Sequence, residues 1–111
     1  MRILLLIFIM TTACTKKQAV PASEMSADQL AERGKAIYSA NCIACHHLDS
    51  KKDGSLGPAV YGSSLELLTE RIMHAKYPAG YKPKRETATM AALPHLSAEI
   101  PALHAYLNSS L

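Results

Sequence analysis

The chain has 111 residues, which is enough for one domain with a modest core. Its formal net charge is only +3, and no run of basic residues with interleaved aromatics occurs, so the composition argues against a nucleic-acid partner. With one Phe, no Trp and an aromatic content of 5%, the sequence has few large aromatic side chains. A small domain of this kind is hard to stabilise from its own side chains alone.

The N-terminus has the pattern of an export signal. Arg2 is followed by an apolar run over residues 3–10, which is too short to span a bilayer as a stable helix. Cys14 follows small residues and resembles the lipidated cysteine of a bacterial lipoprotein signal, although Thr11 stands where such signals usually have an aliphatic residue. The alternative is ordinary cleavage nearby, which leaves Cys14 as a stray thiol or removes it. An odd cysteine in an exported chain favours lipidation.

These features predict three segments. Residues 1–13 are expected to be a lipoprotein-type signal peptide, residues 14–25 an anchor and flexible tether, and residues 26–111 the folded domain. The protein would then lie on the periplasmic side of a bacterial membrane, held by a lipid anchor, or be soluble in the periplasm without one. Loss of the signal leaves 11 basic and 9 acidic side chains, so overall charge says little about partners.

The domain is predicted to begin with a helix from about residue 27 into residue 39 or 40. Ser26 and Gln29 form a capping-box pattern before it. Gly34 lies within this helix and costs it about 1 kcal/mol relative to alanine. Close approach of another helix would explain the glycine, and an ordinary tolerated glycine is the alternative. Apolar residues recur at helical spacing: Leu30, Ile37 and Tyr38.

Residues 42–46 read Cys-Ile-Ala-Cys-His, the C-x-x-C-H signature for attachment of c-type haem. On one helical turn, Cys42, Cys45 and His46 project from one face. The two thiols can add to the two vinyl groups of a haem, and the imidazole can bind the iron as proximal ligand. The motif therefore predicts one covalent haem c with its iron.

Two other uses of the motif are a disulfide within the turn and one half of a zinc site. A zinc site needs a second pair of ligands, but no further cysteine is available and the other histidines are scattered: His74, His95 and His104. His47 is expected to be an exposed loop residue that faces away when His46 faces the iron. A buried porphyrin also supplies the apolar body that the composition lacks, so we expect the haem-free chain to be largely unfolded.

From residue 30 to residue 107 the chain resembles a small class I cytochrome c of the bacterial monohaem type. The resemblance implies an all-α, cytochrome c-like fold in which three to four helices pack around a covalently attached haem. It also implies that the N- and C-terminal helices cross, with a glycine on the first and an aromatic residue on the last. Gly34 and Tyr106 match those places.

Residues 57–62 resemble the family's G-P-x-L-x-G stretch, with Val60 and Tyr61 in place of the commoner pattern. The resemblance implies that the carbonyl of Pro58 accepts a hydrogen bond from the proximal imidazole. Such a bond fixes the orientation of the ring and raises its basicity. The alternative is that Gly57 and Pro58 only turn the chain.

A second helix is predicted after a capping box formed by Ser63 and Glu66. Its apolar residues recur at helical spacing, and it should end before Pro78. Met73 and His74 lie near its end, and either can be proposed as an iron ligand. A methionine on a helix more often packs in a core, so Met73 is expected to do so.

The segment from Pro78 to Pro94 shows no periodicity, and a loop of this length in a compact domain is usually functional or disordered. Met90 falls just before the last helix, where the resembled family carries its distal Met ligand. A thioether prefers ferrous iron and should raise the reduction potential. A loop methionine packed on the domain is the alternative reading, and His95 is the competing distal ligand.

A last helix is predicted with Ser97 as its cap and Pro101 near its first turn. An apolar stripe runs along it, formed by Ile100, Leu103 and Leu107. Tyr106 lies close enough to this stripe to reach the first helix.

Two axial ligands, His46 and Met90, would leave no open position on the iron. The sequence therefore favours a one-electron carrier over an enzyme. A basic group precedes Met90 and would border the haem edge, where it would steer an acidic redox partner such as a respiratory dehydrogenase, reductase or oxidase: Lys82, Lys84 and Arg85. A simple solvated loop is the other interpretation of these cations.

Two alternative functions remain open at this stage. If Met90 is not a ligand, the protein would be a haem enzyme or gas sensor with an open distal site. It could also be a cytochrome subunit of a larger oxidoreductase complex, with no free carrier role.

Overall fold

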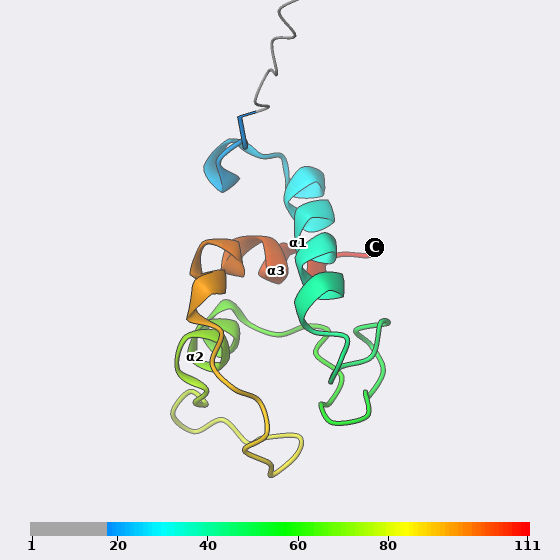
Figure 1. Ribbon diagram of the computed structural model, residues 1–111, viewed down its shortest axis with the longest axis vertical. Coiled ribbons are helices and arrows are strands. Elements are labelled where there is room, and N and C mark those ends of the chain that lie inside the picture. Colours follow the sequence, from blue (N-terminus) through cyan, green and yellow to red (C-terminus); the bar gives the residue numbers. More distant parts are fainter. Residues whose placement is uncertain (1–17) are drawn as a thin grey trace, which may run out of the picture.

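The computed structural model describes residues 18–111, which form helices and loops without a strand. The predicted signal peptide and Cys14 lie outside the described residues. In chain order the elements are η1 (Ala22–Glu24), α1 (Ala27–Asn41), α2 (Leu65–His74), η2 (Pro94–Glu99) and α3 (Ile100–Leu107). Figure 1 shows α1 crossing α3, with α2 beside η2 and long loops gathered toward the C-terminal end of α1.

The all-α prediction with crossing terminal helices is confirmed. Three α-helices and two 3-10 helices make up the regular structure of residues 18–111. No helix in this range combines the length and the apolar character that a membrane crossing requires. The shared core gathers side chains from all three α-helices and η2: Tyr38, Leu68, Ile72, Leu96, Ile100, Leu103, Tyr106 and Leu107.

Helix α1 begins as its sequence predicts. The Ser26 hydroxyl accepts a hydrogen bond from the Gln29 amide at 3.2 Å, and the Gln29 side chain accepts one from the Ser26 amide at 2.9 Å. These two bonds satisfy amide donors that a helix start otherwise leaves unpaired. The helix ends at Asn41, so that Cys42 becomes its C-cap and the attachment motif follows directly.

The crossing of α1 and α3 depends on the absence of a side chain at Gly34. A Cβ atom at this position would lie 2.5 Å from the carbonyl carbon of Ala102 and 2.8 Å from Cβ of Tyr106. Next to this contact the rings of Tyr38 and Tyr106 pack with their centroids 5.5 Å apart. The close approach that we inferred from the glycine is therefore present, at the residue pair expected.

The predicted start of α2 is off by one residue. Ser64, not Ser63, is the N-cap, and its hydroxyl accepts a hydrogen bond from the Leu67 amide at 3.1 Å. Ser63 instead donates its hydroxyl hydrogen to the carbonyl of Val60 at 2.6 Å. Two adjacent serines offer the same cap chemistry, and the turn before the helix decides between them. The helix ends at His74, before Pro78 as expected, and its C-cap Ala75 lies in the left-handed region at φ 54°.

Ser97 does not cap the last helix, so that prediction is wrong. Ser97 lies inside η2, and its carbonyl accepts a hydrogen bond from the amide of Ile100, where α3 begins. The N-cap position is Glu99, whose side chain makes no cap hydrogen bond. The 3-10 turns supply backbone carbonyls for the first amides of α3, which removes the need for a side-chain cap. Pro101 lies in the first turn, as predicted.

A bidentate ion pair between Arg33 and Glu99 joins α1 to η2. Arg33 donates from Nε to Oε2 of Glu99 at 2.7 Å and from Nη2 to Oε1 at 2.6 Å. The planar guanidinium matches the carboxylate in this arrangement, which makes the pair directional. The bond to Arg33 holds the pKa of Glu99 below its ordinary value.

Replacing Glu99 by glutamine is expected to lower the thermal stability of the haem-loaded protein at neutral pH. A carboxylate with a depressed folded pKa stabilises the fold above its unfolded pKa, and this contribution is lost as the pH falls through the folded pKa. The difference between wild type and Glu99→Gln should therefore shrink in acid. Glu32→Gln, on the exposed side of α1, is the matched control. Equal destabilisation at all pH values would contradict the assignment.

Candidate cofactor site

A cavity of about 370 Å³ opens beyond the C-terminal end of α1. Its volume lies in the range of roughly 300–1,000 Å³ that is usual for sites of small molecules and cofactors. Much of its wall is the core itself, because six core side chains line it: Tyr38, Leu68, Ile72, Leu96, Leu103 and Leu107. The two loops that follow α1 and α2 complete the wall.

The attachment motif forms one part of this wall. The amides of Cys45 and His46 both donate to the carbonyl of Cys42, at 3.2 and 2.9 Å, so the chain makes one further helical turn after α1. Cys42, Cys45 and His46 all line the cavity, as their spacing predicts. Burial, followed by the neighbouring Cys45, raises the pKa of Cys42 to about 11, so that at neutral pH it is a protonated thiol.

The two alternatives for the motif find no support in the described part of the chain. Cys42 and Cys45 are free thiols and are not joined by a disulfide. No group of three or more His, Cys, Asp or Glu side chains that could hold a metal ion occurs among residues 18–111. The two cysteines of the motif therefore have no second pair of zinc ligands there.

The His46 ring is fixed by the loop that contains Pro58. Nδ1 of His46 lies 2.8 Å from the carbonyl oxygen of Pro58. Because a carbonyl only accepts, Nδ1 is the donor in this contact, and in the neutral tautomer of the ring Nε2 then carries the lone pair. The expected hydrogen bond to Pro58 is thus present, and it fixes the orientation of the imidazole.

Two glycines make room for His46, one beside its ring and one beside its backbone. A Cβ atom at Gly57 would lie 2.5 Å from Cε1 and 2.6 Å from Nδ1 of His46. A Cβ atom at Gly54 would lie 2.6 Å from the carbonyl carbon of His46. The ring and its backbone therefore pack directly against these residues. The Gly57-Pro58 dipeptide is the available signal in the sequence. It indicates a turn or a hydrogen-bond acceptor at Pro58, but not the space that Gly57 leaves for the ring.

Met90 also lines the cavity and is half-buried against the core. The competing ligands do not: Met73 packs against the core, and His74 and His95 are exposed. His47 is exposed as well, as expected. Among the Met and His side chains of residues 18–111, only His46 and Met90 line the cavity.

A sequence model of the cytochrome c family matches residues 31–110, which is more than half of the chain. The chain belongs to the cytochrome c family. This membership confirms the resemblance to a small class I c-type cytochrome that the motif and helix pattern predict. It also supports an electron-carrier role.

A relative of this cytochrome c is the Cytochrome c-553-like protein of Synechocystis sp. (strain ATCC 27184 / PCC 6803 / Kazusa). The two are 41% identical over 44 residues, which cover 40% of this chain and 40% of that protein. The matched stretch thus spans less than half the length of the relative. No solved structure is significantly similar to the chain.

The cavity of this cytochrome c fits its family's cofactor, a covalently attached haem c with iron. Two thiols three residues apart face the cavity together with an imidazole whose Nε2 is free. The rest of the wall is largely apolar, as a porphyrin requires. When bound, the haem iron supplies a redox centre that gains and releases one electron. The thiols would hold the porphyrin, and the protein's remaining task is to orient it and exclude water.

Cations of two segments also reach the cavity of the cytochrome. Lys84 and Arg85, from the loop before Met90, line it, whereas Lys82 does not. Arg71 lines it from α2 and lies over the ring of Tyr77 at 4.2 Å. The Arg71 guanidinium thus makes a cation–π contact with the ring of Tyr77. The sequence pattern of the first group indicates either a docking rim or a solvated loop, and it gives no signal for Arg71.

Proposed function

We propose that this protein is a one-electron carrier whose haem iron is bound by His46 and Met90. The proposal is supported most directly by the pairing of Nδ1 of His46 with Pro58, which leaves Nε2 for the metal. It is also supported by Met90, because no other Met or His side chain of residues 18–111 joins His46 in lining the cavity. Cys42 and Cys45 would carry the two thioether bonds.

Ligation by two side chains favours electron transfer over substrate chemistry. No position on the iron is then open to oxygen or another small molecule, so an enzyme or gas sensor is disfavoured. A thioether ligand in an apolar cavity stabilises the ferrous form and raises the reduction potential. The core side chains that line the cavity would limit the access of water to the iron.

Replacing Met90 by alanine is expected to abolish the weak deep-red absorbance band of Met-ligated ferric haem. The vacated position should let carbon monoxide bind the ferrous protein, and the reduction potential should fall because the thioether no longer favours ferrous iron. Optical spectra and a redox titration of purified holoprotein measure all three effects.

Met73→Ala is the matched control, because Met73 is a half-buried methionine of α2 that does not line the cavity. It should keep the deep-red band and exclude carbon monoxide. A band that survives Met90→Ala, or that is lost in Met73→Ala, would contradict the proposed ligand. A wild-type protein without the band would point to an open distal site.

The partners proposed are redox proteins, either a dehydrogenase or reductase that supplies the electron or an oxidase that accepts it. Lys82 and Lys84 are exposed on the loop before Met90 and would favour an acidic docking surface. Electron-transfer rates that do not change with salt concentration would contradict this electrostatic part. The same chemistry would serve a cytochrome subunit of a larger complex, which co-purification from membranes would identify.

We propose the same three-part organisation as the sequence predicts, with a signal over residues 1–13, a tether over 14–25 and the domain over 26–111. The described end of the tether contains η1, none of whose residues is buried. Cys14 would carry the lipid that holds the protein on the periplasmic side of the membrane. Mass spectrometry of the mature N-terminus decides whether Cys14 is lipidated.

A further inference from the structure

The loop segment that carries Met90 has few connections to the rest of the domain. Between Tyr81, whose amide donates to Pro78, and Leu93, whose amide donates to Ile72, no backbone hydrogen bond holds it within residues 18–111. Its hydrogen bonds come from two side chains. Lys84 donates from Nζ to the carbonyl of Ala59 at 2.8 Å, and Arg85 donates from Nη2 to the carbonyl of Gly54 at 3.3 Å.

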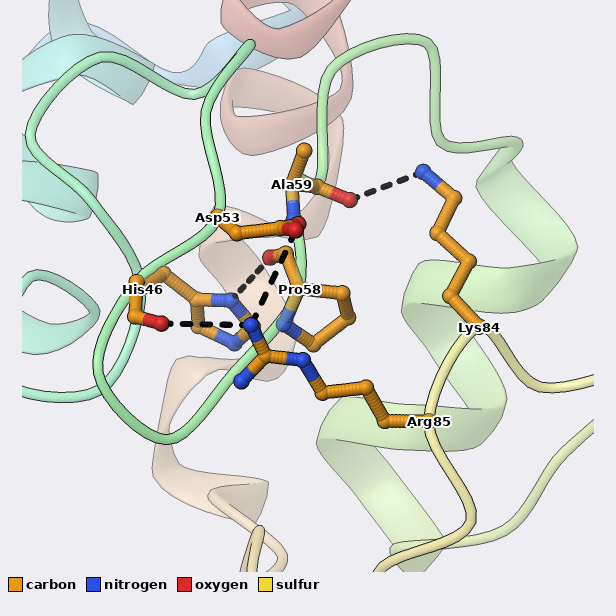
Figure 2. Close-up of polar contacts among 7 residues, drawn as sticks. His46, Asp53, Pro58, Ala59, Lys84 and Arg85 are labelled. Atoms are coloured by element: carbon orange, nitrogen blue, oxygen red, sulfur yellow. Dashed lines mark hydrogen bonds and ion pairs between the residues drawn. The ribbon is translucent and has the colours of Figure 1, made fainter.

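Both bonds end on the loop that fixes His46. Figure 2 shows Lys84 and Arg85 reaching across to the loop of Asp53, Pro58 and Ala59, in which the Pro58 carbonyl is bonded to the imidazole of His46. Asp53 faces Arg85 with one carboxylate oxygen, at 3.8 Å, and accepts a hydrogen bond from the Ala59 amide with the other, at 2.8 Å.

That loop is itself closed by backbone bonds. The Gly54 amide donates to the carbonyl of Gly57 at 2.8 Å, and the Gly57 amide donates to the carbonyl of Cys45 at 2.9 Å. Pro58, between Gly57 and Ala59, holds the His46 ring. The segment with the distal methionine is therefore connected, through two cations, to the short loop that orients the proximal histidine.

We propose that Arg85, assisted by Lys84, is a positioning residue that latches the Met90 segment to the proximal loop and so keeps Met90 on the iron. This inference rests on the proposed ligation by His46 and Met90. Without the latch, the stretch between Tyr81 and Leu93 would be held only by its two ends and by the packing of Met90. The thioether would then leave the iron more often, although the helices would stay as they are.

The ion pair with Asp53 is the weaker part of the latch. Its side chains are 32% and 67% exposed for Arg85 and Asp53, so solvent screens the attraction. The hydrogen bonds to backbone carbonyls carry more weight, because each has a charged donor. The effect of the latch should therefore depend on the geometry of the guanidinium as well as on its charge.

The test is the rate at which imidazole replaces the methionine on the ferric iron of purified holoprotein. When imidazole is in excess, this rate is set by how often the thioether leaves. Arg85→Gln is expected to raise it about tenfold. Arg85→Lys, which keeps the charge but replaces the planar guanidinium, should fall between Arg85→Gln and wild type. Adding Lys84→Gln to Arg85→Gln should raise the rate further.

Lys82→Gln is the matched control, since Lys82 lies on the same loop, is exposed and forms no hydrogen bond or ion pair with residues 18–111. It should leave the rate unchanged. A wild-type ferric protein without the deep-red band would refute the ligation itself. If that band is present and Arg85→Gln exchanges at the wild-type rate, the ligation stands and the latch is refuted. A shifted reduction potential at an unchanged exchange rate would likewise refute it, because it reports only the charge of Arg85.

Discussion

Replacing Cys42 and Cys45 together by alanine is expected to abolish covalent haem attachment and, with it, the stable fold. Both thiols face the cavity, and the described chain offers no other cysteine to replace them. The core side chains around the cavity would then face an empty or water-filled space. Loss of the cofactor should thus destabilise the whole domain.

The size of the cavity sets the scale of this effect. An apolar cavity left in a core costs about 24 cal/mol per Å³, so about 370 Å³ corresponds to about 9 kcal/mol. Opening of the cavity to water lowers this cavity term, and the lost burial of the porphyrin adds to it. The whole net stability of a domain is typically about 5–15 kcal/mol. A small all-α domain has little else to offset such a loss.

The measurement has two readouts on protein matured in a host that attaches haem. After acid-acetone extraction, a pyridine haemochrome spectrum should find haem in the wild-type protein and none in the double variant. Near-UV circular dichroism of the haem-free variant should lack native signals. Ile43→Ala, between the two cysteines and 41% exposed, is the matched control and should keep its haem. Native-like dichroism of the haem-free variant would show that the helices do not need the cofactor.

Features that depend on neighbours in sequence were predictable here. The capping box of Ser26 and Gln29 and the turn of the attachment motif involve residues three or four positions apart. Gly34 was also informative, because a glycine inside a helix is unfavourable unless something approaches it closely. The bond from His46 to Pro58 followed from the family resemblance, since its two partners lie in different loops.

Features that depend on how segments meet were not predictable. Ser97 has the chemistry of a cap, but the 3-10 turns of η2 satisfy the first amides of α3 without it. Arg33 and Glu99 lie 66 positions apart, and no local pattern links them. The contacts of Arg85 with the loop of Gly54 likewise exist only after both loops surround the cavity. In each case a surface-type residue gains its role from tertiary structure.

Replacing Gly34 by alanine is expected to destabilise the haem-loaded protein by about 3 kcal/mol. Local propensity predicts the opposite, because alanine is favoured over glycine by about 1 kcal/mol inside a helix. The reversal comes from the crossing, where a Cβ atom would lie 2.5 Å from the carbonyl carbon of Ala102. The obstacle is the backbone of α3, so no change of rotamer can relieve it and the two helices must separate.

Thermal or denaturant unfolding of the holoprotein measures the effect, with Ala36→Gly as the matched control. Ala36 is exposed on the same helix, so its replacement should cost only the propensity difference of about 1 kcal/mol. The two variants exchange the same pair of residues in opposite directions, yet both should be less stable than wild type. A Gly34→Ala protein as stable as wild type would mean that α1 and α3 can move apart without loss. The shared core, to which Tyr38 and Tyr106 contribute on the two sides of the crossing, would then not depend on their close approach.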